Sequence, residues 1–149
     1  PFAHIIETGI WNGQGSCMQF RTEDSAYVAI EINGDMAAAA RERGFDVRTG
    51  TSAGLLAVLL LTRQAPAFFW LDAHLVAEAD EPNDSPLLEE LDAILAWPHA
   101  AESVILVDDV RMMGRDGWPS LGGVIDRLGP GCPWSVEVRD DILRLTPLT

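Results

Sequence analysis

The stretch Ser103–Arg111, "SVILVDDVR", places two adjacent carboxylates directly after a run of apolar residues. Val104–Val107 is short and continuously apolar, which is typical of a strand buried on both faces of a parallel sheet. A second stretch, "FFWLDAH", repeats the arrangement, because Phe68–Leu71 is followed by Asp72 and His74. Charged groups at the end of a buried strand are expected where the strand reaches the edge of a sheet. The two stretches therefore predict strands that carry their chemistry at their carboxyl ends.

Strand and helix patterns alternate along the rest of the chain. We expect strands at 4–8, 27–32, 45–50, 67–72 and 103–109, and helices at 34–44, 52–64, 86–97 and 121–128. A glycine-rich turn and a helix are expected within 12–22, and 134–147 reads as two strands joined by a tight turn at 139–141. Such alternation indicates right-handed βαβ units. The sequence predicts an α/β fold with a Rossmann-like, doubly wound sheet of seven strands, mostly parallel with an antiparallel strand in the edge region, and helices on both faces.

The composition indicates one globular domain spanning residues 1–149, with a net charge of −13. That charge would repel nucleic acids and anionic membranes, so we expect neither as a partner. It favours a cation or a neutral or cationic small molecule, although it is explained equally well by solubility. Cys17 and Cys132 lack CxxC spacing, which favours free thiols and a cytoplasmic protein over a disulfide. A homo-oligomer remains possible.

The carboxyl ends of the expected strands carry most of the candidate ligand-binding residues. Ligands of open parallel sheets bind there, where the strand order reverses. Gly9, Gly13 and Gly15 follow the first strand in a GxxxGxG spacing, which is a weak signal and differs from the GxGxxG of dinucleotide binders. Glu31 ends the second strand, where a carboxylate can accept both hydroxyls of a ribose. The alternative for Glu31 is a solvated strand end.

The segments "IIETGIWNGQGS", "AIEIN", "VRTGTS", "FFWLDAH" and "VILVDDVR" together resemble class I S-adenosylmethionine-dependent methyltransferases. The resemblance extends from Ile5 to about Pro147. The helical part that usually precedes the first strand is missing, so we expect a chain cut from a longer protein. The resemblance implies that the first-strand acid and the glycine turn hold the methionine part of the cofactor, that the second-strand acid holds the ribose, and that the residues after the third strand flank the adenine. These positions are Glu7, Gly9 and Gly13 for methionine, Glu31 for ribose, and Gly50, Thr51 and Ser52 for adenine, with Asp72 also at the cofactor.

A narrower resemblance concerns metal-dependent O-methyltransferases of the macrocin type. It implies that Asp72, Asp108 and Asp109 surround a magnesium ion. Those enzymes carry another aspartate, taken as the general base, two residues after the first one, and this chain has His74 there. An imidazole can accept a proton near neutral pH, so His74 together with Asp72 is the expected catalytic pair. The alternatives are that Arg111 or a backbone amide pairs one aspartate without a metal, and that His74 only caps the strand end.

The resemblance implies methyl transfer from S-adenosylmethionine to an oxygen of a small molecule, assisted by Mg²⁺. A non-catalytic nucleotide- or cofactor-binding scaffold of the same fold is the alternative. A nicotinamide-dependent oxidoreductase is disfavoured by the glycine spacing and the paired aspartates. Trp11, inside the glycine turn, would either shield the cofactor or pack in the core. The loop 78–84 would be a solvated loop or a lid.

Overall fold

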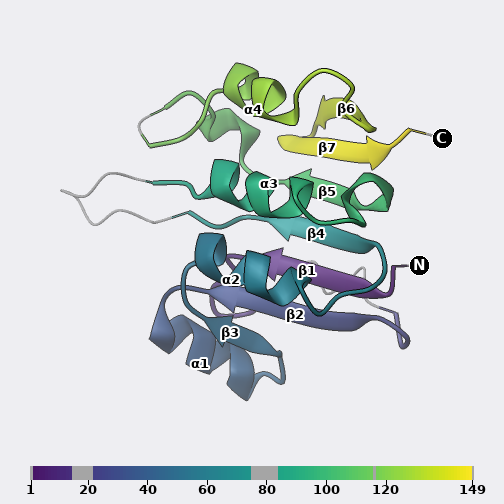
Figure 1. The fold of residues 1–149 in the computed structure, drawn as a ribbon. Coiled ribbons are helices and arrows are strands. Elements are labelled where there is room, and N and C mark those ends of the chain that lie inside the picture. Colours follow the sequence, from purple (N-terminus) through teal and green to yellow (C-terminus); the bar gives the residue numbers. More distant parts are fainter. Residues whose placement is uncertain (1, 15–21, 75–83, 116, 149) are drawn as a thin grey trace.

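The computed structural model describes residues 2–14, 22–74, 84–115 and 117–148, and within them the chain forms a seven-stranded sheet (Figure 1). The strand order is β3-β2-β1-β4-β5-β7-β6. The strands are β1 (His4–Thr8), β2 (Ala26–Glu31), β3 (Val47–Thr49), β4 (Ala67–Leu71), β5 (Val104–Val107), β6 (Trp134–Arg139) and β7 (Ile142–Pro147).

The strands β1 to β5 pair in parallel, and β7 is antiparallel to both β5 and β6, so β6 runs in the same direction as β5. The predicted mostly parallel sheet with an antiparallel strand next to its edge is confirmed. The strand order reverses between β1 and β4, since β2 and β3 lie on one side of β1 and the later strands on the other. Thr8 is in register with Ile30 and with Leu71, and Leu71 with Val107. The residues that follow these four strands therefore stand level along one edge.

Helices cover both faces of this sheet, as predicted. α1 (Gly34–Glu42) packs through Ala37 and Ala40 on one face. α2 (Ser52–Leu60), α3 (Leu87–Leu95) and α4 (Leu121–Leu128) contribute their buried residues to the larger core cluster on the other face (Figure 1). Two 3₁₀ turns, η2 (Ala100–Glu102) and η3 (Val110–Met112), were not predicted.

Local interactions set where the helices begin and end. The Asn33 side chain caps α1 by accepting the amides of Asp35 and Met36. Thr51 caps α2 through the amide of Gly54, so Ser52 is the first helical residue, as the predicted start of this helix implies. α2 also ends at Leu60, four residues earlier than the pattern indicated.

Two sequence predictions lie outside the described residues. The helix expected within 12–22 falls mostly on 15–21, and the possible lid at 78–84 falls almost entirely on 75–83. In the described part of the chain, no helix combines the length and the apolar character needed to span a bilayer. Cys132 is a partly buried free thiol, and Cys17 belongs to the segment that is not described.

Candidate functional site

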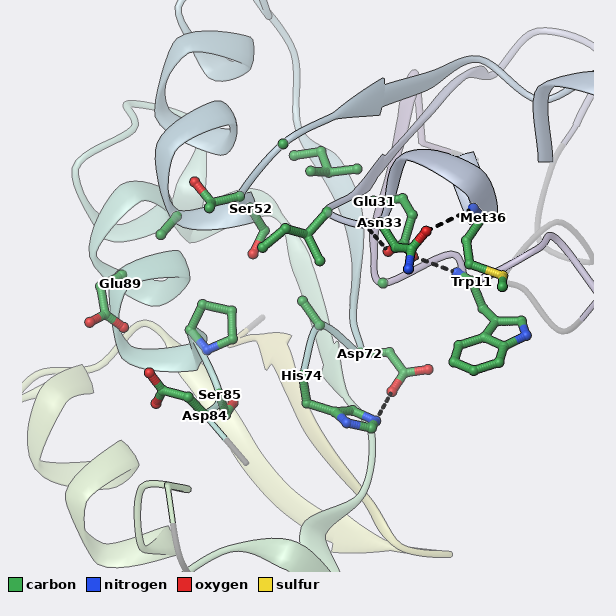
Figure 2. Close-up of a pocket in the computed structure, with 18 residues that line it drawn as sticks. Trp11, Glu31, Asn33, Met36, Ser52, Asp72, His74, Asp84, Ser85 and Glu89 are labelled. Carbon is green, nitrogen blue, oxygen red and sulfur yellow. Dashed lines mark hydrogen bonds and ion pairs between the residues drawn. The ribbon is translucent and has the colours of Figure 1, made fainter. Parts of the chain in front are cut away.

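A cleft of about 860 Å³ lies at the carboxyl ends of the parallel strands (Figure 2). Its walls come from the ends of β1, β2, β3 and β4 and from the first turns of α1, α2 and α3. This is the point where the strand order reverses, which is where open α/β sheets bind their ligands. The volume is within the range of small-molecule sites. The lining residues are Gly9, Trp11, Ile30, Glu31, Ile32, Asn33, Met36, Gly50, Thr51, Ser52, Ala53, Asp72, Ala73, His74, Asp84, Ser85, Pro86 and Glu89.

Glu31 is fixed at the edge of this cleft by backbone amides. One carboxylate oxygen accepts the N–H of Trp11 at 2.8 Å, and the other accepts the N–H of Asn33 at 2.9 Å. The residue is only 7% exposed, so its orientation is set by the protein. A carboxylate has about four lone pairs available for hydrogen bonds. Two acceptor positions therefore remain for a ligand.

The glycines after β1 are required by the packing of the protein itself. Gly9 has φ +77°, and a Cβ at this position would lie 2.2 Å from the carbonyl oxygen of Asp72. Gly13 has φ +78°, and a Cβ there would lie 2.8 Å from the ring of Phe45. Glycine at such positions permits a tight turn and would also permit close approach of a ligand to the backbone. The tight turn is present, but the close approach is to β4 and to Phe45.

The residues after β3 line another part of the cleft. Gly50, Thr51 and Ser52 all contribute to its wall. The amide of Gly50 donates to the carbonyl of Glu31 at 2.9 Å, which holds this segment against the end of β2. Ser52 is buried at the start of α2.

Asp72, His74 and Asp109 bring three possible metal-ligand atoms within 4.8 Å of one another. The Nε2 atom of His74 lies 3.8 Å from a carboxylate oxygen of Asp72 and 3.6 Å from one of Asp109. The His74 ring is tilted against the ring of Trp118, at 5.4 Å between centroids. The histidine that departs from the macrocin-type pattern therefore belongs to the cluster.

The electrostatics of the cluster favour a bound positive charge. Burial, together with repulsion from Asp108, Asp109 and Glu7, raises the pKa of Asp72 to about 8. Burial also raises the pKa of Asp108, against a hydrogen bond from the amide of Asp109. At neutral pH the cluster therefore either keeps a proton on one of its carboxyl groups or is stabilised by a bound cation.

Asp109 is aimed by an unusual backbone conformation. Its φ of 60° is left-handed, which is uncommon for a residue other than glycine. One of its carboxylate oxygens pairs with the Arg111 guanidinium at 2.6 Å, while the other faces His74. Arg111 is largely exposed, so the pair is at the surface and not in the core. Asp109 therefore pairs with Arg111 and faces His74 at the same time, through different carboxylate oxygens.

The predicted site residues are only partly brought together. Glu7 lies outside the cleft lining, is 2% exposed and accepts a hydrogen bond from the Tyr27 hydroxyl. Gly13, Asp108 and Asp109 are also absent from the lining, and Asp108 is not part of the converging group of three.

Several residues that line the cleft were not singled out from the sequence. On the side of Glu31 these are Ile32, Asn33 and Met36, and on the opposite side Asp84–Pro86 and Glu89. Their common signal is position, because each directly follows a strand or begins the next helix. A search of the residues that follow β2 and begin α1 would have selected Asn33 and Met36.

The chain is similar in structure to solved methyltransferases. An O-methyltransferase of Bacillus cereus in complex with S-adenosylhomocysteine is 18% identical, covering 97% of this chain and 74% of that chain at a TM-score of 0.68. An O-methyltransferase of Streptomyces achromogenes involved in tomaymycin synthesis, in complex with S-adenosylmethionine, is 19% identical, with coverages of 98% and 74% and a TM-score of 0.67. A putative rRNA methylase of Clostridium thermocellum is 11% identical, with coverages of 98% and 89% and a TM-score of 0.65. No protein-family model and no curated protein matches the sequence. This chain therefore has the fold of the S-adenosylmethionine-dependent methyltransferases, O-methyltransferases among them.

Proposed function

We propose that this chain binds S-adenosylmethionine in the 860 Å³ cleft and transfers its methyl group to an oxygen of a small molecule. The observation that carries the proposal is Glu31. Its carboxylate is held by two backbone amides at the end of β2, inside a methyltransferase fold, and it keeps acceptor capacity for two hydroxyls. A ribose presents two neighbouring hydroxyls that fit this arrangement.

The residues in the wall of the cleft indicate where the rest of the cofactor would lie. With the ribose at Glu31, the adenine would lie along Gly50–Ser52, and the methionine part would extend past Gly9 toward Asp72. Glu7 and Gly13 would then support the methionine side from behind the lining. Their assignment rests on the resemblance of the motif.

The reacting groups are His74 and Asp72. The acceptor hydroxyl gives its proton to Nε2 of His74, and its oxygen attacks the methyl carbon of the sulfonium. The carbon–sulfur bond breaks, and the sulfur leaves as the thioether of S-adenosylhomocysteine. Asp72, 3.8 Å from the same imidazole nitrogen, would stabilise the imidazolium that forms.

The residues also fit a divalent cation. Asp72 and Asp109 come from the ends of two neighbouring strands, their oxygens converge, and the raised pKa of Asp72 supports a site that favours positive charge. Oxygen ligands of this kind suit Mg²⁺, and Asp108 is adjacent in the sequence. A cation held there would favour ionisation of a substrate hydroxyl.

A small-molecule acceptor is favoured over a nucleic acid. The chain carries a net charge of −13, and the cleft region adds Asp72, Asp84 and Glu89. A phosphate backbone would be repelled by this field. The similarity to an rRNA methylase concerns the fold, which does not determine the acceptor.

The Glu31→Ala variant tests the cofactor assignment. Loss of two hydrogen bonds to a charged group, worth about 1.5–3 kcal/mol, should weaken S-adenosylhomocysteine binding by about tenfold to a hundredfold in titration calorimetry. Asp35→Ala is the matched control, because this acid is outside the cleft lining, and it should leave the affinity unchanged.

Equal affinity in wild type and Glu31→Ala would contradict the ribose assignment. Tighter binding of NADH than of S-adenosylhomocysteine by the wild type would contradict the cofactor. Binding without methyl transfer to any hydroxylated acceptor would support the non-catalytic scaffold instead.

A further inference from the structure

The most strained aromatic residue of the described chain lies in the wall of the cleft. Trp11 has φ 57°, in the left-handed region that bulky side chains rarely adopt. The same loop supplies glycine at its other left-handed positions, Gly9 and Gly13. If residue 11 were needed only to give the backbone its left-handed turn, glycine would adopt that turn with less strain. We therefore look for a role of the indole side chain to explain why tryptophan occupies this position.

The Trp11 indole is not a core side chain. It is 52% exposed and belongs to neither of the two core clusters of described residues. Figure 2 shows it on the same side of the cleft as Glu31 and Met36. Of the two readings of Trp11 that the sequence allowed, core packing is excluded by this placement.

The backbone of Trp11 is tied to the proposed ribose-binding residue. Its amide donates to Glu31 at 2.8 Å, so the left-handed conformation of Trp11 supplies one of the two hydrogen bonds that orient Glu31. Ile32, 49% exposed, and Met36 line the same part of the cleft. These residues form an exposed apolar surface around a fixed carboxylate, which suits a ligand with an apolar or aromatic part next to a hydroxylated sugar.

From this geometry we infer that the Trp11 indole covers the adenosyl part of the bound ligand on the Glu31 side of the cleft. The inference rests on the proposed function, since it assumes that an S-adenosyl compound occupies the cleft. An indole face excludes water from the sugar and gains contact area when the ligand enters. The strain at Trp11 is consistent with this role, because strained backbone persists where a side chain must be aimed at a ligand.

The test uses Trp11→Gly and Trp11→Phe in the intact chain, with S-adenosylhomocysteine as the probe. Glycine adopts φ 57° without strain, so Trp11→Gly removes the indole while the amide can still reach Glu31. Aromatic contact with a base is worth about five- to 150-fold in affinity, so we expect calorimetric affinity to fall by about tenfold to a hundredfold. Trp11→Phe should stay within about threefold of wild type. Leu61→Ala, an exposed leucine outside the lining, should change nothing.

Tryptophan fluorescence gives a second readout. Saturating S-adenosylhomocysteine should change the emission of the wild type, and most of the change should be absent in Trp11→Phe, although calorimetry shows that variant to be bound. Wild-type affinity in a folded Trp11→Gly protein, or an unchanged fluorescence response in Trp11→Phe, would overturn this inference and leave the proposed function intact. No binding by the wild type would instead overturn the proposed function, and this inference with it.

Discussion

His74 is the residue at which proton transfer and cation binding compete for the same atom. Its Nε2 faces the carboxylates of Asp72 and Asp109, at 3.8 Å and 3.6 Å. Its Nδ1 is buried and has no hydrogen-bond partner among the described residues. The ring is instead oriented by its contact with Trp118. A ring held by packing leaves Nε2 available to accept a proton from a substrate.

Removing the imidazole should separate these two roles. We expect His74→Ala to lower turnover by about 10²–10⁴, the usual contribution of a positioned base, with an acceptor that the wild type methylates. S-adenosylhomocysteine affinity by calorimetry and Mn²⁺ affinity by electron paramagnetic resonance should stay within about threefold. His74→Gln should be nearly as inactive, because an amide cannot act as a base at neutral pH.

Two results would contradict the assignment of His74 as base. Wild-type turnover in His74→Gln would make the ring an orienting or packing group. Loss of Mn²⁺ binding in His74→Ala, with S-adenosylhomocysteine binding intact, would make it a metal ligand.

At the scale of secondary-structure elements, the β6–β7 hairpin is connected to the acidic cluster through Arg111. Asp140 and Asp141 form the turn, with φ of 55° and 66°. Asp141 accepts the amide of Arg111 at 2.7 Å, pairs with its guanidinium, and accepts the amide of Val110 through its carbonyl. Arg111 in turn pairs with Asp109. The turn thereby fixes η3 and the direction of Asp109.

The two turn residues offer a matched pair of variants. Asp140→Gly relieves a left-handed residue whose ion pairs are exposed and worth little, so its unfolding free energy should be unchanged or higher by up to about 1 kcal/mol. Asp141→Gly relieves the same strain but loses the hydrogen bond and ion pair to Arg111, so its unfolding free energy should be lower than that of Asp140→Gly. Urea denaturation measures both. Equal stabilities would show that the Arg111 contacts contribute nothing.

The elements were largely predictable, and the differences have local causes. α4 and the closing hairpin follow the sequence pattern closely, because Ser120 and Gly129 delimit the helix and the alternation in 134–147 is clear. The end of α2 could not be predicted from its leucine run, because that run gives no amphipathic signal. The amides of Thr62 and Arg63 donate to the carbonyl groups of Leu59 and Leu60, three residues earlier, which is the pattern of a turn and not of an α-helix.

At the scale of the whole molecule, the alternation of elements predicted the edge of the sheet but not which side chains meet there. Glu7 and Thr8 are neighbours that face opposite sides of β1, so Glu7 reaches Tyr27 rather than the cleft. Asp108 and Asp109 diverge because of the left-handed turn at Asp109. Such divergence depends on single backbone angles, which residue spacing does not encode.

One buried carboxyl group should dominate part of the pH dependence of folding. Glu90, on α3, is fully buried where β1, α2 and α3 meet beneath the cleft. Burial raises its pKa to about 7 from the ordinary 4.5, while the hydroxyls of Ser52 and Thr8 act in the opposite direction. Between pH 4.5 and 7 the unfolded chain therefore releases a proton that the folded chain keeps.

The unfolding free energy should consequently fall as the pH rises through this window. The contribution of Glu90 should become constant above a pH of about 7. At 1.36 kcal/mol for each pH unit, the loss from Glu90 amounts to about 3 kcal/mol. Glu90→Gln carries no titrating group, so it should be more stable than wild type at pH 8 and similar at pH 4.5. The slope that remains in this variant would come from Asp72, whose pKa is raised to about 8. Glu89→Gln, which removes the neighbouring exposed carboxyl group, should keep the wild-type slope in urea denaturation from pH 4 to 8. If Glu90→Gln also keeps that slope, Glu90 is ionised in the folded protein, and the stability of the fold does not depend on its proton.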